Sequence, residues 1–269
     1  MSSSQQITGQ PASKNPPETG AASHSEIAKF WSQLREEAQR IASGEPTLIA
    51  LVDDVILSRD SAAAALGARL ARRLAREDMP RSTMEPLLYG VFERHPTIVD
   101  CAMRDLLAIH ERDPACFSPL EPLLFFKGFL ALTTYRVSHQ LWQDDRRWLA
   151  LYLQSVASEA FAVDIHPAAR IGCGILLDHA TSFVVGETAI IDDNVSILHE
   201  VTLGGTGKET GDRHPIIRSG VLLGAGSVVL NDVPPHTTVA GVPAIIVGEA
   251  IEANPAIEMN QHLDCRGMI

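Results

Sequence analysis

The chain lacks an apolar segment long enough to span a bilayer, and it has few cysteines. Its longest apolar stretch, PLLFFKGFLALTTY, is interrupted by Lys127 and does not predict a membrane span. Residues 1–24 are polar and contain no signal-peptide core, so we expect a disordered leader. The four cysteines show no CxxC spacing, which favours reduced thiols of a cytoplasmic protein over a disulfide framework or a zinc site: Cys101, Cys116, Cys173 and Cys265.

Basic residues are also scarce. The chain has 22 Lys and Arg against 33 Asp and Glu, a formal net charge of -11. Nucleic acids and anionic membrane surfaces attract clustered positive charge. The charge balance therefore argues against both as partners.

A six-residue apolar repeat begins at Ile165 and runs nearly to the C-terminus. The first position of each hexad is apolar: Ile165, Ile171, Leu177, Phe183, Ala189, Val195 and Val201. An α-helix would place apolar residues every three or four positions instead. The repeat predicts a solenoid of short parallel strands, in which each unit buries its apolar residue against its neighbours. A β-sandwich with glycine-rich turns is the alternative, but it does not require one register over seven hexads.

The residues before the repeat have a helical period. In SEIAKFWSQLREEAQRIA the apolar residues fall on one stripe, and Ser25 is placed to cap the helix start. The sequence therefore predicts an α+β chain with four parts. These are a leader at 1–24, an α-helical domain at 25–160, a β-solenoid at 161–248 and a flexible tail at 249–269.

Three polar clusters interrupt the solenoid pattern: Asp164 before the first hexad, the pair Asp178 and His179, and the insertion GKETGDRHPI with Arg213 and His214. Insertions in solenoids are extruded on one face and often line binding sites. A histidine beside carboxylates is a candidate general base. Arginine binds a carboxylate with two hydrogen bonds, so the set suits an amino-acid substrate. The alternative is that these residues fill a turn and a solvated loop.

Glycines and small residues in VTLGGTG and LGAGSV have two interpretations. They permit tight solenoid corners. Exposed backbone N–H groups beside them can also bind the amides or phosphates of a long cofactor. The pattern alone leaves both open.

The run DIHPAARIGCGILLDHATSFVVGETAIIDDNVSIL, with GDRHP, VPPHTTVAGVPAIIVG and RDPAC, resembles serine O-acetyltransferases of the hexapeptide-repeat family. The resemblance implies a left-handed parallel β-helix and acetyl transfer from acetyl-CoA to L-serine. This reaction is the first step of cysteine biosynthesis and is inhibited by L-cysteine. It also implies a trimer or a dimer of trimers, active sites between neighbouring subunits, and no metal.

The resemblance also implies residue roles. His179 would be the general base, and Asp164 would orient it. Asp113 and Asp178 would bind the ammonium group of the amino acid. Arg213 and His214 would bind its carboxylate. Four residues would lie along acetyl-CoA: Gly205, Thr206, Ala225 and Ser227. The C-terminal Ile269 would enter the active site of O-acetylserine sulfhydrylase.

The chain departs from the family pattern at one point. Three hexads that usually follow GVLLGAG are absent, so we expect one coil fewer and a reduced acetyl-CoA wall. Two other functions remain open. A weakly active scaffold or regulator of the sulfhydrylase is one. The other is a zinc hydratase of the γ-carbonic-anhydrase type, which needs three imidazoles that converge on the metal. Its HxxxxH pair is absent after His179, because position 184 is Val.

Overall fold

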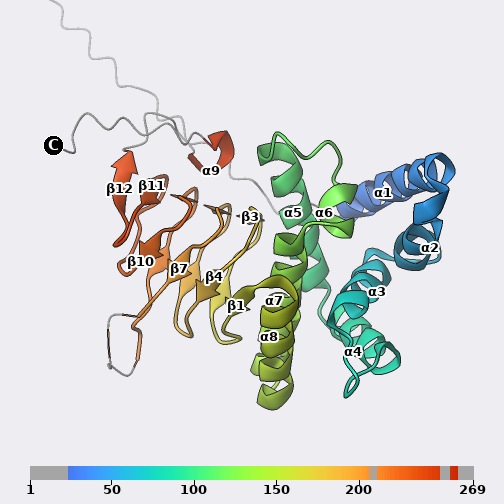
Figure 1. Cartoon of the computed structure of the whole chain (residues 1–269), viewed down its shortest axis with the longest axis horizontal. Helices are drawn as coiled ribbons and strands as arrows, with labels where there is room; N and C mark the ends of the chain where they lie inside the picture. The colour runs from blue at the N-terminus through green and yellow to red at the C-terminus, as the bar shows by residue number, and fades with distance from the viewer. Residues whose placement is uncertain (1–23, 206, 208–210, 249–254, 260–269) are drawn as a thin grey trace, which may run out of the picture.

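The computed structural model describes residues 24–205, 207, 211–248 and 255–259. Helices occupy one side of the molecule and a stack of short strands the other, with α5, α7 and α8 at the junction (Figure 1). The helical elements of the first part are α1 (His24–Gly44), η1 (Pro46–Leu48), α2 (Ile49–Val52), η2 (Asp53–Leu57), α3 (Ala62–Leu74), α4 (Arg81–Arg94), α5 (Pro96–Arg112), α6 (Leu120–Leu124), α7 (Lys127–Gln143) and α8 (Arg147–Phe161).

Local sequence accounts for several helix ends. The Ser61 hydroxyl accepts the Ala64 N–H at 3.2 Å and caps α3, a role typical of serine. Helix α8 ends at Phe161, and the left-handed backbone of the following Ala162 (φ 56°) turns the chain into the first strand. The expected cap at Ser25 is wrong, because Ser25 lies inside α1, whose first described residue is His24. None of the described helices is long and apolar enough to cross a membrane.

The second part is a parallel β-helix with three faces. Its strands are β1 (Val163–Ile165), β2 (Arg170–Ile171), β3 (Leu176–Leu177), β4 (Phe183–Val185), β5 (Ile190–Ile191), β6 (Ser196–Ile197), β7 (Thr202–Leu203), β8 (Ile216–Ile217), β9 (Leu222–Leu223), β10 (Val228–Val229), β11 (Thr238–Ala240) and β12 (Ile245–Gly248). Sheet A is β1-β4-β7-β10, sheet B is β2-β5-β8, and sheet C is β3-β6-β9-β11 with β12 added antiparallel. Each of the first three turns thus contributes one strand to every face, and the fourth contributes β10 and β11 with an isolated bridge between Ile217 and Val233 on the third face. This arrangement confirms the predicted solenoid.

The register differs from the sequence prediction at one turn. Ile165 pairs with Val185, twenty residues further on, whereas Val185 pairs with Leu203, eighteen residues further on. The first coil therefore holds two extra residues, and they lie between Leu177 and Phe183, in the segment that carries the Asp178 and His179 pair. The assignment of Phe183 to the same hexad position as Ile165 is wrong, since Phe183 pairs with Val163.

Buried polar contacts join the two parts. The carboxylate of Asp105 on α5, fully buried, accepts hydrogen bonds from Arg136 on α7 at 2.7 and 3.0 Å and from the Ile175 N–H at 2.9 Å. The Arg136 guanidinium also donates to the carbonyl of Gly172 at 2.7 Å. These contacts fix α5 and α7 against the first coil.

The expectation of reduced cysteines is wrong for one pair. Cys101 on α5 and Cys173 in the turn between β2 and β3 form a disulfide, and their Cα atoms are 4.9 Å apart. The two residues are 72 positions apart in the sequence and meet because α5 packs on the first coil. Sequence spacing does not record this contact.

A short helix, α9 (Pro255–Glu258), packs beside the β-helix and α5 (Figure 1). The carbonyl of Ala256 accepts the Ser196 hydroxyl at 2.6 Å, and Ala256 is fully buried. The expected tail at 249–269 therefore includes an ordered segment at 255–259, and its remaining residues lie outside the described chain. The expected loss of one coil relative to the family stays a prediction.

Candidate active site

His179 lies in the two-residue expansion of the first coil, at the corner between sheets C and A. His179, Ala180 and Ser182 all have left-handed backbone, with φ of 55°, 59° and 60°. The imidazole is 75% exposed, and its Nε2 atom lies 3.8 Å from Asp178 Oδ1. Within the described chain it makes no hydrogen bond. The expanded turn therefore presents this imidazole at the surface and leaves it open to an outside partner.

Helix α7 supports this turn from behind. A Cβ at Gly128 would lie 2.1 Å from the Leu177 carbonyl oxygen, so only glycine lets α7 approach so closely. The Lys127 ammonium donates to Thr181 Oγ1 at 2.5 Å, and the Glu200 N–H donates to the Thr181 carbonyl at 2.7 Å. The backbone around His179 is thus held from two directions.

Asp113 and Asp178 form an acidic pair on the same edge. Asp113 follows the last residue of α5, and its Oδ1 accepts the Ala115 N–H at 2.8 Å. Burial raises the pKa of Asp178, the Asp113 charge raises it further, and the neighbouring His179 opposes both. Two carboxylates whose charges interact favour a bound cation such as an ammonium.

Two further corners stack on the His179 turn. His199 follows β6, and its ring meets the His179 ring edge-on with centroids 5.9 Å apart. Its Nδ1 is buried without a hydrogen-bond partner in the described chain. The Gly226 N–H donates to the His199 carbonyl at 3.0 Å, which places the exposed Ala225 next in the column. We call this column the histidine edge; its members are Asp113, Asp178, His179, His199 and Ala225.

A second column lies at the corner between sheets A and B. The Arg213 guanidinium donates to Glu187 Oε2 at 2.8 Å. Thr188 Oγ1 accepts the N–H groups of Arg213 at 3.1 Å and His214 at 3.2 Å. We call this column the arginine edge; its members are Glu187, Thr188, Gly205, Arg213 and His214.

His214 has one defined tautomer. Its Nδ1 accepts the Thr188 N–H at 3.2 Å, so the proton of the neutral ring is on Nε2. Burial lowers the pKa of His214, and the Arg213 charge lowers it further. The ring is therefore neutral near pH 7 and offers an N–H donor beside the Arg213 guanidinium.

Glycine makes room for this ring. A Cβ at Gly186 would lie 1.9 Å from His214 Nε2, which no other residue would allow. A Cβ at Gly205 would lie 3.3 Å from both His214 Nε2 and the Arg213 carbonyl oxygen. Gly205, expected along acetyl-CoA, thus lies directly beside the two residues expected on the amino-acid carboxylate.

Asp164 is the central residue of β1, and its Oδ1 accepts the Gln154 side-chain amide of α8 at 2.6 Å. Burial lowers the pKa of the nearby His166. The charges of Glu187 and Asp164 raise that pKa, and the charge of Arg213 lowers it. Asp164 thus groups with the arginine edge. In the described residues of a single chain it has no contact with His179, its expected partner.

The two edges lie on opposite sides of sheet A. The histidine edge precedes strand β4, and the arginine edge follows it; this strand has three residues, about 10 Å at the usual rise per residue. A serine molecule is too small to touch both edges of one chain. The exposed Val184 lies on the outer face between them.

The remaining expected cofactor residues differ in access. Ser227 is fully buried, and its hydroxyl donates to the Gly224 carbonyl at 2.6 Å, whereas Ala225 is exposed. Thr206 and Ile269 lie outside the described residues. The contacts expected between acetyl-CoA and its four candidate residues, Gly205, Thr206, Ala225 and Ser227, stay predictions.

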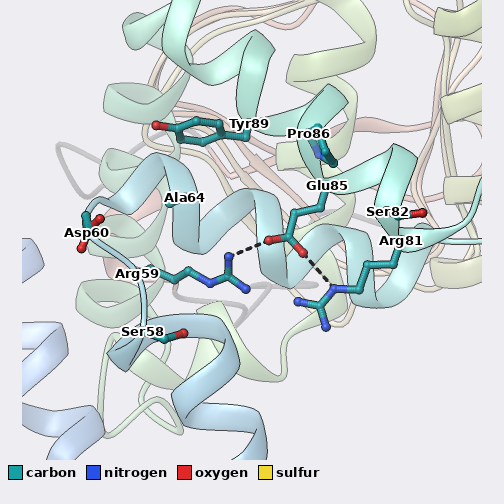
Figure 2. Close-up of a pocket in the computed structure, with 9 residues that line it drawn as sticks. All are labelled: Ser58, Arg59, Asp60, Ala64, Arg81, Ser82, Glu85, Pro86 and Tyr89. Atoms are coloured by element: carbon teal, nitrogen blue, oxygen red, sulfur yellow. Dashed lines mark hydrogen bonds and ion pairs between the residues drawn. The ribbon is translucent and has the colours of Figure 1, made fainter.

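A pocket of about 640 Å³ lies elsewhere, in the helical part between the end of η2 and α4 (Figure 2). Arg59 and Arg81 line it, and both are bound to Glu85, at 2.6 and 2.8 Å. None of the expected site residues lines this pocket. The expected site residues of the histidine and arginine edges lie instead along the β-helix, and each edge carries only part of the expected set.

Sequence reasoning missed four residues of the site: Gln154, Glu187, Thr188 and His199. Glu187 and Thr188 contact the arginine loop because parallel coils place successive A–B corners above one another. The VSILHE hexad carried a signal for His199. This histidine follows β6 as His179 follows β3, so both lie at corners between sheets C and A.

Comparisons with known proteins give the family. A family model described as "Serine acetyltransferase, N-terminal" matches residues 30–134. The chain is 47% identical over 250 residues to the serine acetyltransferase of Haemophilus influenzae, covering 86% of this chain and 94% of that one. The chain belongs to the serine acetyltransferase family.

Solved structures of this family share the fold. A serine acetyltransferase in complex with cysteine superposes with a TM-score of 0.84 at 45% identity, covering 88% of this chain and 99% of that one. The Brucella abortus enzyme in complex with coenzyme A gives a TM-score of 0.79 at 43% identity, covering 85% and 98%. The predicted α-helical domain followed by a hexapeptide-repeat β-helix is confirmed. Among the described residues, no group of three or more His, Cys, Asp or Glu is placed to hold a metal ion.

Proposed function

We propose that this chain transfers the acetyl group of acetyl-CoA to the hydroxyl of L-serine at a site built from two copies. The histidine edge of one copy would face the arginine edge of its neighbour. The observation that carries this proposal is the separation of the two edges across sheet A, together with the exposed His179 imidazole, which makes no hydrogen bond within the described chain. A closed trimer, alone or paired into a hexamer, repeats this contact three times.

His179 is the general base. Its imidazole removes the proton from the serine hydroxyl, and the oxygen attacks the thioester carbonyl of acetyl-CoA. The C–S bond breaks, and the imidazolium returns the proton to the leaving thiolate, so that O-acetylserine and CoA are released. Asp164 of the neighbouring copy orients the ring and stabilises its charged form.

The amino-acid group is held by charge on both sides. Asp113 and Asp178 bind the ammonium, and Arg213 with the Nε2–H of His214 binds the carboxylate. L-cysteine has the same two groups, so it competes for the same contacts. The solved complex of a family member with cysteine supports this assignment.

Acetyl-CoA lies along the histidine edge. In this column, Ala225 is at the second corner beyond that of His179, with the His199 corner between them. Its thioester then reaches the serine oxygen from the same column as the base. The solved complex of the Brucella abortus enzyme with coenzyme A supports this co-substrate. If one coil is absent, inserting a family coil after Gly226 should tighten acetyl-CoA binding and leave serine binding nearly unchanged, as calorimetry would measure.

Two other functions are less well supported. A zinc hydratase needs three converging ligands, and the family found here is a different one. A non-catalytic regulator of O-acetylserine sulfhydrylase would keep the fold and lose turnover. Contact with that enzyme through Ile269 stays a prediction; co-elution of the two proteins, with and without Ile269, tests it. A cytoplasmic location is part of the proposal and is tested by fractionation.

The deciding experiment measures CoA release from acetyl-CoA with and without L-serine. We expect release that depends on serine, saturates with serine and is inhibited by cysteine. Release without serine, or no release by an assembled oligomer, would contradict the proposal. The second result would favour the regulator.

A further inference from the structure

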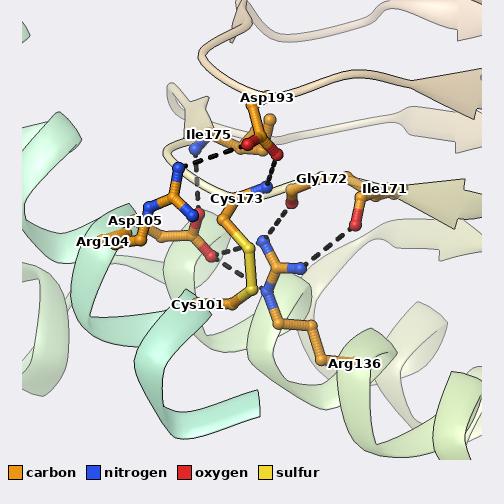
Figure 3. Close-up of a disulfide and its surroundings, with 9 residues drawn as sticks. All are labelled: Cys101, Arg104, Asp105, Arg136, Ile171, Gly172, Cys173, Ile175 and Asp193. Atoms are coloured by element: carbon orange, nitrogen blue, oxygen red, sulfur yellow. Dashed lines mark hydrogen bonds and ion pairs between the residues drawn. A yellow bond between two sulfur atoms is a disulfide. The ribbon is translucent and has the colours of Figure 1, made fainter. Parts of the chain in front are cut away.

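The disulfide between Cys101 and Cys173 joins the helical part to the β-helix (Figure 3). Cys101 lies on α5, and Cys173 lies in the first coil, between β2 and β3. The bond thus adds a second covalent link between two parts that the main chain already joins from α8 to β1. Its closed loop contains the whole of α7 and α8.

Polar contacts surround the bond and hold the same two parts together. Asp193 Oδ1 accepts the Cys173 N–H at 2.7 Å, and its Oδ2 lies 3.3 Å from the Arg104 guanidinium (Figure 3). The buried Asp105–Arg136 pair bonds to the backbone on both sides of Cys173, at Gly172 and Ile175 (Figure 3). None of these contacts involves the sulfur atoms, so reduction removes the covalent restraint and leaves the polar contacts to hold the two parts together.

Access distinguishes this pair from Cys116. Cys101 and Cys173 are both partly exposed, whereas Cys116 is buried. Burial raises the pKa of the Cys116 thiol to about 11, and its Sγ contacts the Ser118 carbonyl oxygen. Small thiols and disulfides react through exposed thiolates, so they reach the pair and leave Cys116 unreacted.

Helix α5 connects the disulfide to the candidate site. Cys101 lies in its second turn, and Asp113 follows its last residue. Asp113 lies twelve positions after Cys101, about 18 Å at the usual helical rise. Arg112, next to Asp113, donates to Ser196 Oγ at 3.2 Å and fixes this end of α5 on the β-helix. A restraint at Cys101 therefore acts on α5, the helix whose C-terminal end positions Asp113.

We propose that Cys101 and Cys173 form a reversible thiol–disulfide site, oxidised by small disulfides and reduced by small thiols, whose oxidised form fixes α5 and Asp113 for serine binding. One protein thiolate attacks the small disulfide and releases one small thiol. The second protein thiolate displaces the other and closes the bond. The two cysteines lose two electrons and two protons, and the small disulfide becomes two thiols. The serine-binding part rests on the proposed function, and the redox part does not.

The first experiment uses the full chain treated with oxidised glutathione or with dithiothreitol. Thiol titration under denaturing conditions should find two fewer thiols in the oxidised wild type. Its Tm should be roughly 5 to 15 °C above that of the reduced protein, from the restraint on the unfolded chain. Cys116→Ser should keep both differences. Cys101→Ser and Cys173→Ser should lose the Tm difference.

No loss of thiols in the wild type, or an equal Tm difference in the Cys101→Ser/Cys173→Ser double variant, would overturn the proposed site. The comparison of oxidised and reduced wild type needs no substitution, so it remains decisive if a variant fails to fold.

The second experiment measures KM values in both states. Reduction should raise the serine KM by about two- to fivefold and leave the acetyl-CoA KM nearly unchanged, because Asp113 faces only the amino acid. The double variant should match reduced wild type in either buffer. An unchanged serine KM, alongside confirmed changes in thiols and Tm, would overturn the link to Asp113. Loss of serine-dependent turnover in both redox states would instead count against the proposed function.

Discussion

The two edges of sheet A differ in how completely one chain assembles them. On the arginine edge, Arg213 is bound to Glu187, and both loop N–H groups are bound to Thr188. On the histidine edge, the His179 ring is largely exposed and has no hydrogen-bond partner among the described residues. The difference indicates that the arginine edge, which we propose binds the amino-acid carboxylate, is positioned within one chain. For the His179 ring, we propose that the orienting partner comes from another copy.

Removing the base should give the largest effect. We expect His179→Ala to lower serine-dependent kcat by about two to four orders of magnitude, the usual contribution of a positioned base. Acetyl-CoA binding, measured by calorimetry, should be nearly unchanged. His95→Ala is the control, since this histidine contacts Asp144 in the helical part, far from both edges. A wild-type rate of CoA release from His179→Ala would remove this residue from the mechanism.

Removing the arginine should affect binding more than turnover. We expect Arg213→Ala to raise the serine KM and the cysteine inhibition constant together by roughly 10- to 100-fold, because charge-assisted hydrogen bonds are among the strongest. Arg218→Ala is the matched control, since its guanidinium bonds Asp192 at 3.4 Å within the chain. Unchanged cysteine inhibition in Arg213→Ala would place the carboxylate elsewhere.

Loosening the arginine edge without removing its charge should give a smaller effect. Thr188→Val keeps the shape of the side chain and removes the acceptor for two N–H groups, so we expect the serine KM to rise roughly tenfold with kcat nearly constant. Thr188→Ser keeps the hydroxyl and should restore binding. Equal KM values for the two variants would show that this hydroxyl does not position the loop.

The smallest expected effect is a pH dependence of stability. The pKa of His214 is lowered from its ordinary value near 6.5, so folding favours the neutral ring. The stability it contributes is present above about pH 6.5 and is lost as the pH falls toward the lowered pKa. The Tm of wild type minus that of His214→Gln should therefore be larger at pH 7.5 than at pH 5.5. His166 is present in both proteins, and its charge also lowers the pKa of His214 in wild type. A difference that grows on acidification would contradict the lowered pKa of His214.

The sequence predicts the solenoid well because each coil must bury apolar residues at a fixed period. It does not predict the expanded turn at His179. Two positions of each hexad point inward, as Phe183 and Val185 show, so the apolar pattern continues in either register.

The candidate site is predicted only in part, for a related reason. Asp178, His179, Arg213 and His214 stand out as polar breaks in an apolar repeat. Their partners Gln154, Glu187 and Thr188 come from other coils or helices, and the Cys101–Cys173 bond joins residues 72 positions apart. Only packing in three dimensions brings such pairs together.

The most direct test of the two-copy site mixes two variants that each damage one edge, assayed at a serine concentration well below the raised KM of Arg213→Ala. His179→Ala and Arg213→Ala chains with different tags are co-assembled, and mixed oligomers are purified through both tags. In a closed trimer that contains both variants, one of the three interfaces receives both intact edges, so a site between copies predicts about one third of wild-type activity. Wild type mixed with the double variant and purified in the same way is the control: a site between copies predicts about one sixth, and a site within one chain about one half. Activity no higher than that of the parent variants, in confirmed mixed oligomers, would contradict the account.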